Sequence, residues 1–306
     1  MNFPINELPN IEFKLNEPLS KYTFTKTGGN ADTLAFPKTR QELVDIVNVA
    51  RDNDVKITVI GNASNLIIKD GGIRGVVIIL PNFNQIKIDG QKVIAEAGAT
   101  IIDTTIAAQA AGLTGMEFAA GIPGSIGGAV FMNAGAYGGE VRDVFESADV
   151  LMPNGEIKTF NHDDMEFDYR KSLIQRNGGI VVSATFALKP GNKADIQAEM
   201  DRLNALRRSK QPLEYPSCGS VFQRPVGHFT GPLIIKAGLQ GKIIGGAQVS
   251  MKHAGFIVNI NHATATDYMD LIHLIQKTVK EKFDVELHTE VRIIGEDKVG
   301  EVRANS

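Results

Sequence analysis

Apolar and polar positions follow first a helical and then a strand period in the opening part of the chain. Residues 39–42, Thr-Arg-Gln-Glu, have the spacing of a capping box. The apolar residues behind it recur with the period of a helix: Leu43, Ile46, Val47 and Ala50. Residues 55–60 then alternate as a strand that ends at Gly61, and residues 33–36 form a strand before the helix. This pattern predicts a small α/β subdomain over residues 1–74.

The pattern changes to mostly strands from residue 75 onward. Short β-type runs cover residues 75–80, 85–89 and 92–97, and Asp89-Gly90 between the last two is a hairpin signal. A helix is expected over residues 100–111, stopped by Gly112. Further strands are expected at 147–152, 156–160 and 180–188. These elements predict a second α+β subdomain over residues 75–200.

The remaining chain, residues 201–306, is expected to form a third domain. The helical pattern of residues 194–209 ends in Arg207-Arg208-Ser209-Lys210 and links into it; a solvated charged face explains this basic end equally well. A second helix is expected over residues 266–283, with an apolar face of Tyr268, Ile272, Ile275, Val279 and Phe283. A strand at 290–294 ends the ordered fold, either in this domain or back in the first subdomain. A polar tail follows from Gly295.

Residues 121–139 are rich in glycine, yet apolar residues such as Ile122, Ile126 and Val130 run through them. Loops are normally polar, so this pattern favours a fixed, half-buried cradle over a surface loop. The spacing is neither G-x-G-x-x-G nor G-x-x-x-x-G-K-[ST], which argues against the two common nucleotide-binding motifs. Residues 61–66, Gly-Asn-Ala-Ser-Asn-Leu, follow a strand at the edge where open α/β sheets bind ligands. A plain turn is the alternative there.

Composition narrows the classes of protein and site. The chain has 306 residues, 43% of them hydrophobic, and a net charge of −3. Those values predict two or three domains and argue against a nucleic-acid or membrane-surface protein. The single cysteine, Cys218, excludes an intramolecular disulfide, and six histidines without ligand spacing give no support for a metal site. Without a signal peptide or an apolar span of about 20 residues, the expected location is the cytoplasm.

Few residues offer catalytic chemistry when each is judged singly. Cys218-Gly219-Ser220 places two candidate acids or nucleophiles in one glycine-containing turn, but no G-x-S-x-G elbow is present. Ser220 alone is more typical of a turn serine, and Arg170 and Glu290 alone are more typical of salt-bridge or surface residues. Only their combination with the other motifs changes that interpretation.

The motifs together resemble the UDP-N-acetylenolpyruvoylglucosamine reductase family, the MurB-type flavoenzymes. They occur in the family's order and cover nearly the whole chain: residues 23–29, 61–66, 121–128 with 133–138, 169–172, 219–222, 252–256 and 290–295. The short interval between Tyr169 and Lys210 is similar to the shorter form of the family, which lacks an extra substrate-capping loop.

The resemblance implies an α+β fold: a two-subdomain FAD-binding fold of the vanillyl-alcohol-oxidase type, with a smaller α+β substrate domain. It implies non-covalent FAD held by a nest of backbone N–H groups. The implied cofactor-binding residues are Gly61, Asn62, Ala63, Ser64, Asn65, Gly121, Ile122, Pro123, Gly124, Ser125, Ile126, Gly127, Gly128, Asn133, Gly135 and Ala136. Ala63 departs from the family, which usually has Gly at this position.

The implied reaction is reduction of an enolpyruvyl sugar nucleotide with NADPH as co-substrate, in peptidoglycan precursor synthesis. In this scheme Arg170 holds the substrate carboxylate, and Glu290 assists the developing charge, as a carboxylate or as a protonated acid. Ser220 delivers the proton to the α-carbon. Lys210 and Arg224 are the implied ligands of the substrate diphosphate, with Arg224 in place of the Asn of the longer form. A monomer is expected.

Two other functions stay open at the sequence level. Another oxidase or dehydrogenase on the same flavin fold would need its own catalytic set, and many tether the flavin through a His or Cys, which the cradle segments lack. A non-catalytic sugar-nucleotide sensor would need Lys210 and Arg224 but not the set of Arg170, Ser220 and Glu290.

Overall fold

The chain divides into two units in the computed structural model, which describes residues 3–298. The first comprises Met1–Leu15, Thr33–Asn62 and Gly75–Arg207, and the second comprises Asn16–Asp32, Ala63–Arg74 and Arg208–Ser306. The expected division into three domains stays a prediction. Most of the expected polar tail lies outside the described residues. No helix within residues 3–298 is long and apolar enough to cross a bilayer.

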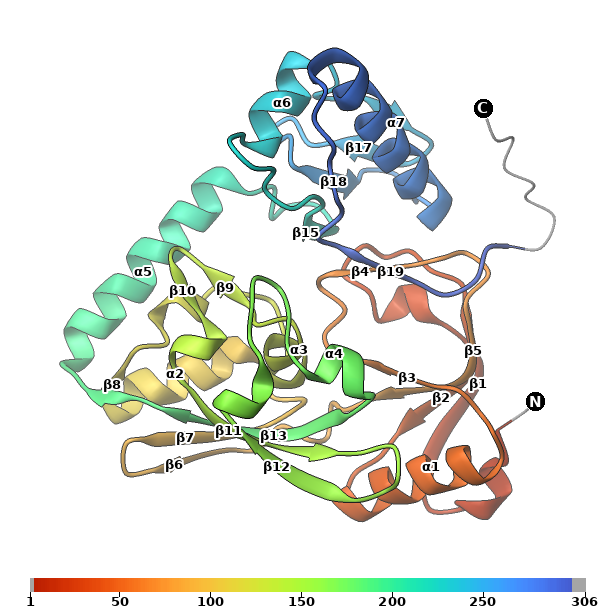
Figure 1. Ribbon diagram of the computed structural model, residues 1–306, viewed down its shortest axis with the longest axis vertical. Coiled ribbons are helices and arrows are strands. Elements are labelled where there is room, and N and C mark those ends of the chain that lie inside the picture. The colour runs from red at the N-terminus through yellow and green to blue at the C-terminus, as the bar shows by residue number, and fades with distance from the viewer. Residues whose placement is uncertain (1–2, 299–306) are drawn as a thin grey trace. The chain divides into compact units, whose positions relative to one another are not determined.

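The first unit contains a five-stranded antiparallel sheet in the order β12-β11-β13-β7-β6. Its strands are β6 (Ile86–Asp89), β7 (Lys92–Glu96), β11 (Phe145–Leu151), β12 (Ile157–Asn161) and β13 (Ile180–Ala187). Helices α2 (Ile101–Ala111) and α3 (Ile126–Phe131) cover one face of this sheet (Figure 1). Helix α2 begins one residue later than predicted and ends where predicted, with the Thr100 side chain accepting from Asp103 N and Gly112 in a left-handed conformation at φ 73°.

Helix α1 (Arg40–Asp52) packs its apolar face onto strands of a second sheet, which has the order β1-β2-β5-β3. These strands are β1 (Glu12–Pro18), β2 (Asn30–Phe36), β3 (Ile57–Ile60) and β5 (Ile73–Ile79), and β3 runs parallel to β5. The predicted capping box forms only in part. Thr39 accepts from Glu42 N, but the Glu42 carboxylate accepts from Lys38 N at 2.6 Å.

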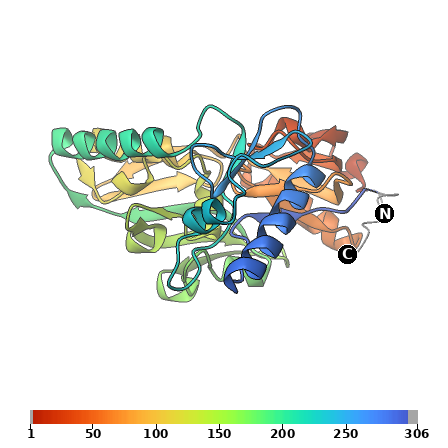
Figure 2. The same ribbon diagram turned by 90° about the horizontal axis from the view of Figure 1, so that it is seen from above.

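Helix α5 (Lys193–Lys210) is one continuous helix, visible at full length in Figure 2. Ile196, Met200 and Leu203 form its buried stripe. Short elements complete this part of the chain: β8 (Leu113–Thr114) paired with β14 (Lys189–Pro190), β9 (Gly135–Ala136) paired with β10 (Gly139–Glu140), and α4 (Ile174–Asn177). Single 3-10 turns cover Ile5–Glu7, Leu19–Lys21, Glu117–Ala119, Val141–Asp143 and Asp163–Met165.

The second unit is built on an antiparallel sheet in the order β15-β18-β17-β16, against which helix α7 (Ala265–Phe283) packs (Figure 1). The strands are β15 (Ser217–Ser220), β16 (Ile243–Ile244), β17 (Ala247–Val249) and β18 (Phe256–Asn259), and α6 (Thr230–Lys236) contacts α7. Carboxylates accept hydrogen bonds from the backbone N–H groups in the first turn of α7. Asp267 completes a capping box with Thr264, and Asp70 accepts from the N–H groups of Ala265 and Thr266.

Strand β19 (Arg292–Ile294) pairs in parallel with β4 (Leu66–Ile68), with Arg292 opposite Leu66. It begins two residues later than predicted, because residues 290 and 291 instead donate to the carbonyl of Val221. The sequence interpretation also missed α3, α4, α6 and the strands β16–β18. Helix α3 was missed because Gly127 and Gly128 are poor helix formers.

Candidate active site

Two of the predicted cofactor-binding segments lie against each other in the first unit. The Asn62 side-chain amide donates to the Pro123 carbonyl at 3.1 Å. A Cβ on Gly61 would overlap the Ser125 hydroxyl, so the backbone of Gly61 approaches Ser125 as only glycine allows. The structure thus joins residues 61–62 to residues 121–128, which are 60 positions apart in the sequence.

The glycines of this cradle differ in how much space the surrounding structure leaves for a side chain. A Cβ on Gly127 would lie 3.1 Å from the Cβ of Ala97, so the packing of α3 on β7 requires a small residue there. A Cβ on Gly124 would meet nothing nearer than Ile122 at 3.8 Å, and its φ lies outside the left-handed range. Internal packing therefore does not demand glycine at position 124.

Most N–H groups of residues 121–128 already donate within the protein. The Ile122 N–H donates to the Ala119 carbonyl, and the Gly124 N–H donates to the Ile122 carbonyl. The Ile126 N–H donates to the Ala99 carbonyl, and the Gly127 N–H donates to the Ala97 carbonyl. The Gly128 N–H donates to the Ser125 hydroxyl. The backbone nest expected from the sequence therefore has fewer donors to offer than eight consecutive residues suggest. The shape of the cradle and its neighbouring side chains must therefore contribute more to cofactor binding than its backbone N–H groups do.

Arg207 supplies a cation beside this cradle. A Cβ on Gly121 would lie 2.9 Å from Cδ of Arg207 and 2.6 Å from the side-chain oxygen of Asn204. Burial lowers the pKa of the Arg207 guanidinium, while the nearby Tyr137 acts in the opposite direction. An arginine remains charged in a protein, and a partly desolvated charge favours an anionic partner. The sequence interpretation left Arg207 in a basic helix end and did not assign it to the site.

Asn133 is fully buried, and its side chain binds three protein partners. Its amide donates to the Glu140 carboxylate and to the Asp168 carbonyl, both at 3.1 Å, and its carbonyl accepts from Arg142 N at 3.0 Å. The predicted neighbours Gly135 and Ala136 form β9 and pair with β10. The structure therefore gives Asn133 a positioning role in the loop that carries Arg170.

Arg170 lies at the tip of a tight turn closed by paired hydrogen bonds between Asp168 and Lys171. Its φ of 56° is left-handed, a strained conformation for a residue with a Cβ. The guanidinium donates to the Gly135 carbonyl at 3.1 Å and lies 4.9 Å from the centre of the Tyr169 ring. The half-buried side chain is thus held by its own loop and by β9.

Ser220 and Cys218 face opposite environments in the second unit. Ser220 is exposed, whereas Cys218 is 1% exposed within the core under α7. Gly219 between them has a φ of 75°, and the pairing of β15 with β18 shifts register there. Burial raises the pKa of the Cys218 thiol to about 12. Of the two candidate acids, only Ser220 is therefore accessible to a substrate.

The Val221 peptide links Ser220 to Glu290. Its carbonyl accepts from Glu290 N at 2.8 Å and from Val291 N at 3.3 Å, and its N–H donates to the Gly255 carbonyl at 2.9 Å. The Asn65 side chain in turn donates to the Glu290 carbonyl at 3.3 Å. One predicted cofactor residue and two predicted catalytic residues therefore meet within the second unit, although the sequence separates them widely.

The other predicted residues of this unit differ in their burial. Ala63 is buried with a left-handed φ of 49°, which accounts for the usual Gly at this position in the family. Ser64 is partly buried beside it. Lys210 ends α5 with an exposed side chain. Arg224 is also exposed and stacks over the Phe229 ring, with 3.9 Å between the guanidinium carbon and the ring centre.

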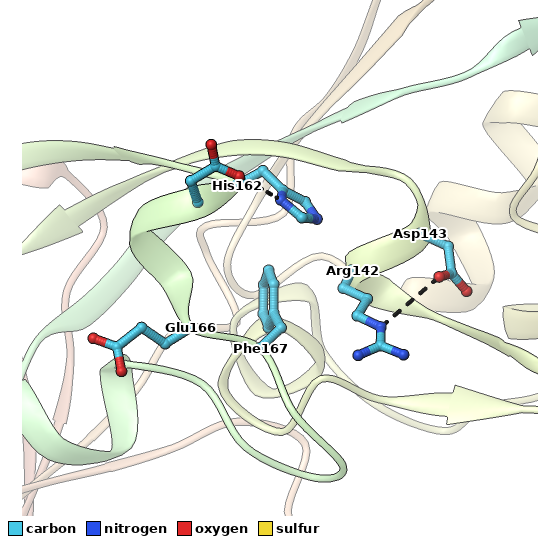
Figure 3. Close-up of a pocket in the computed structure, with 6 residues that line it drawn as sticks. Arg142, Asp143, His162, Glu166 and Phe167 are labelled. Carbon is cyan, nitrogen blue, oxygen red and sulfur yellow. Dashed lines mark hydrogen bonds and ion pairs between the residues drawn. The ribbon is translucent and has the colours of Figure 1, made fainter.

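An open pocket in the first unit is lined by other residues (Figure 3). Its lining set is Arg142, Asp143, His162, Asp163, Glu166 and Phe167. The carboxylates outnumber the one arginine; an ion pair joins Arg142 to Asp143, and a hydrogen bond joins His162 to Asp163. This charge balance disfavours a phosphorylated ligand. Residues 3–298 also contain no group of three or more His, Cys, Asp or Glu side chains placed to hold a metal ion.

Comparisons with known proteins give one consistent result. Residues 31–161 match the model of an FAD-binding domain, and residues 211–294 match that of the UDP-N-acetylenolpyruvoylglucosamine reductase C-terminal domain. The reductase of Lactobacillus acidophilus is 66% identical over 94% of this chain and 96% of its own, and that of Enterococcus faecalis is 62% identical over 96% and 98%.

A solved structure agrees with these relatives. The crystal structure of the Thermus caldophilus reductase matches with a TM-score of 0.79 and 34% identity, over 93% of this chain and 98% of the other. The expected α+β FAD-binding fold with a substrate domain is confirmed by these matches. The chain belongs to the UDP-N-acetylenolpyruvoylglucosamine reductase family.

Proposed function

We propose that this protein reduces UDP-N-acetylenolpyruvoylglucosamine to UDP-N-acetylmuramate, with FAD as its cofactor and NADPH as the reductant, in peptidoglycan precursor synthesis. The observation that carries the proposal is the Val221 link. It holds an accessible serine and the backbone of Glu290 together in a chain that is 62–66% identical to curated reductases over most of its length.

The cradle of the first unit fits an FAD diphosphate. Gly124 leaves space for it, Gly61 and Ser125 bring two segments together, and Arg207 offers a positive charge. When bound, FAD would supply the hydride chemistry that connects NADPH with the β-carbon of the enolpyruvyl group. The protein provides neither a His nor a Cys in residues 61–65 or 121–139, which supports non-covalent binding.

Side chains of the protein stabilise the negative charge that forms on the substrate and supply the proton that the α-carbon receives. Hydride addition at the β-carbon places negative charge on the substrate carboxylate as an enolate. Arg170, held by its turn and by Gly135, stabilises that carboxylate as a charged hydrogen-bond donor. Glu290 helps to stabilise the negative charge that develops on the enolate. The Ser220 hydroxyl delivers the proton to the α-carbon. A serine suffices because the enolate is strongly basic and close proton transfer needs position more than acidity.

Lys210 and Arg224 bind the diphosphate of the sugar nucleotide in this proposal. Both side chains are exposed, and stacking on Phe229 restricts the Arg224 guanidinium before any ligand arrives. Arginine forks match phosphate oxygens in pairs, whereas lysine acts as a point charge. We also propose that the protein acts in the cytoplasm, where UDP-sugars and NADPH are available, and that it is a monomer.

A visible spectrum of the purified protein tests the proposed function. The protein should be yellow and release FAD into the supernatant on acid precipitation. NADPH should bleach the flavin band without oxygen, and the enolpyruvyl sugar nucleotide should then restore it. A protein that cannot be loaded with FAD, or a bleached band that the enolpyruvyl substrate leaves unchanged, would contradict the proposal.

A further inference from the structure

His253 lies in the loop before β18 with its imidazole packed onto Gly255. Its Nδ1 accepts the Gly255 N–H at 3.1 Å. A Cβ on Gly255 would lie 3.0 Å from Cε1 and 3.2 Å from Nδ1 of the ring, so a larger residue at position 255 would crowd the imidazole. The ring also meets Phe256 edge-on, with 4.8 Å between their centres. The His253 side chain therefore determines the position of the Gly255 peptide.

The protonation state of His253 agrees with this contact. Burial lowers the pKa of the imidazole, which favours the neutral ring at physiological pH. An Nδ1 that accepts a hydrogen bond carries no proton, so the proton of the neutral ring is on Nε2. The loop itself is fixed on the other side by the Ser250 hydroxyl, which accepts from Lys252 N and His253 N.

The Gly255 peptide continues directly to the proposed proton donor. Its carbonyl accepts the Val221 N–H at 2.9 Å, and Val221 follows Ser220 in the chain. Ser220 is also the strand partner of Phe256, which follows Gly255. The Val221 carbonyl then accepts from Glu290 N. A continuous series of hydrogen bonds therefore runs from the His253 ring through Val221 to the backbone of Glu290.

We propose that His253 is a positioning residue for proton delivery, because its Nδ1 fixes the Gly255 peptide that holds the Ser220–Val221 backbone in place. It acts through that backbone and does not touch the substrate. This inference rests on the proposed role of Ser220. Small displacements of a catalytic group are costly, and about 1 Å can reduce a rate roughly a hundredfold.

The test compares His253→Leu with His253→Asn in the FAD-loaded enzyme. Leucine removes the acceptor, whereas an asparagine side chain can accept the N–H two residues further on, as Nδ1 does. Stopped-flow absorbance measures two steps separately: bleaching of the flavin by NADPH and its return with the enolpyruvyl substrate. We expect His253→Leu to slow the return roughly tenfold to a hundredfold at saturating substrate. Bleaching should be unchanged, and His253→Asn should recover most of the loss.

Two controls separate this inference from the proposed function. His273→Leu, on the exposed face of α7, should leave both steps unchanged. Ser220→Ala should slow the return step. If Ser220→Ala returns at the wild-type rate, the proposed role of Ser220 is wrong and this inference falls with it. If Ser220→Ala is slow but His253→Leu is not, or if His253→Asn is as slow as His253→Leu, the positioning role alone is wrong.

Discussion

At the scale of single residues, burial decides between chemically similar candidates. A free thiol is intrinsically a better acid than a serine hydroxyl. Cys218, however, is 1% exposed, and burial raises its thiol pKa to about 12. The sequence shows both residues in one short turn but not the left-handed Gly219 that places them in different environments. Accessibility therefore favours Ser220 as the donor.

The first prediction compares these two residues. Ser220→Ala should leave bleaching of the flavin by NADPH intact and slow its return with the enolpyruvyl substrate by about 10² to 10⁴, the usual effect of a positioned acid. Cys218→Ala should leave both steps unchanged and reduce the free energy of unfolding by about 1 kcal/mol. A Cys218→Ala enzyme with a slow return step would show that the thiol takes part.

The second prediction concerns the exposed cations. Lys210→Ala and Arg224→Ala should each weaken sugar-nucleotide binding by roughly 1.5 to 3 kcal/mol, the range for a charged hydrogen bond. Isothermal titration calorimetry measures this directly. Bleaching by saturating NADPH should change little. Lys277→Ala, an exposed lysine on α7, is the matched control. Wild-type affinity in both variants would mean that other residues bind the diphosphate.

At the scale of elements, the same residue type serves different purposes within one segment. Gly127 packs against Ala97 inside the fold, while a side chain at Gly124 would make only an ordinary contact with Ile122. A glycine-rich pattern in the sequence cannot separate these cases, because the difference depends on strands β7 and β13 that arrive from elsewhere in the chain. Helix α3 was missed for the same reason, since its packing on β13 outweighs its weak intrinsic propensity.

The third prediction uses that difference. Gly124→Val should fold with a melting temperature close to that of the wild-type apoprotein but lose FAD on gel filtration, because the branched side chain fills the cradle. Gly127→Val should instead lose stability, because its side chain must displace Ala97. Flavin content and thermal unfolding are measured on both variants. Full flavin retention by Gly124→Val would contradict the proposed FAD site.

The fourth prediction concerns the loop that carries Arg170. Asn133→Leu removes three hydrogen bonds of a fully buried side chain, which should cost roughly 1–3 kcal/mol of unfolding free energy. Urea denaturation checks this cost. Asn84→Leu, at an exposed position, should cost less than about 0.5 kcal/mol. Equal stability of the two variants would mean that Asn133 does not hold this loop.

At the scale of the whole molecule, the sequence predicted the long periodic elements and the family, but not the contacts of the site. Helices α1, α2, α5 and α7 begin within one residue of their predicted starts, because caps and periodicity are local signals. The Val221 link and the Arg207 contact with Gly121 join segments that lie far apart in the sequence. Local patterns do not encode them. The roles of the site residues stay predictions for the experiments above.

The most direct test of the central claim is the position of hydrogen in the product. The enzyme is supplied with NADPH and UDP-N-acetylenolpyruvoylglucosamine in D₂O, and the product is examined by NMR and mass spectrometry. We expect UDP-N-acetylmuramate with one deuteron at the α-carbon, because the Ser220 hydroxyl exchanges its proton with solvent. Failure to form this product, or an α-carbon without deuterium, would contradict it.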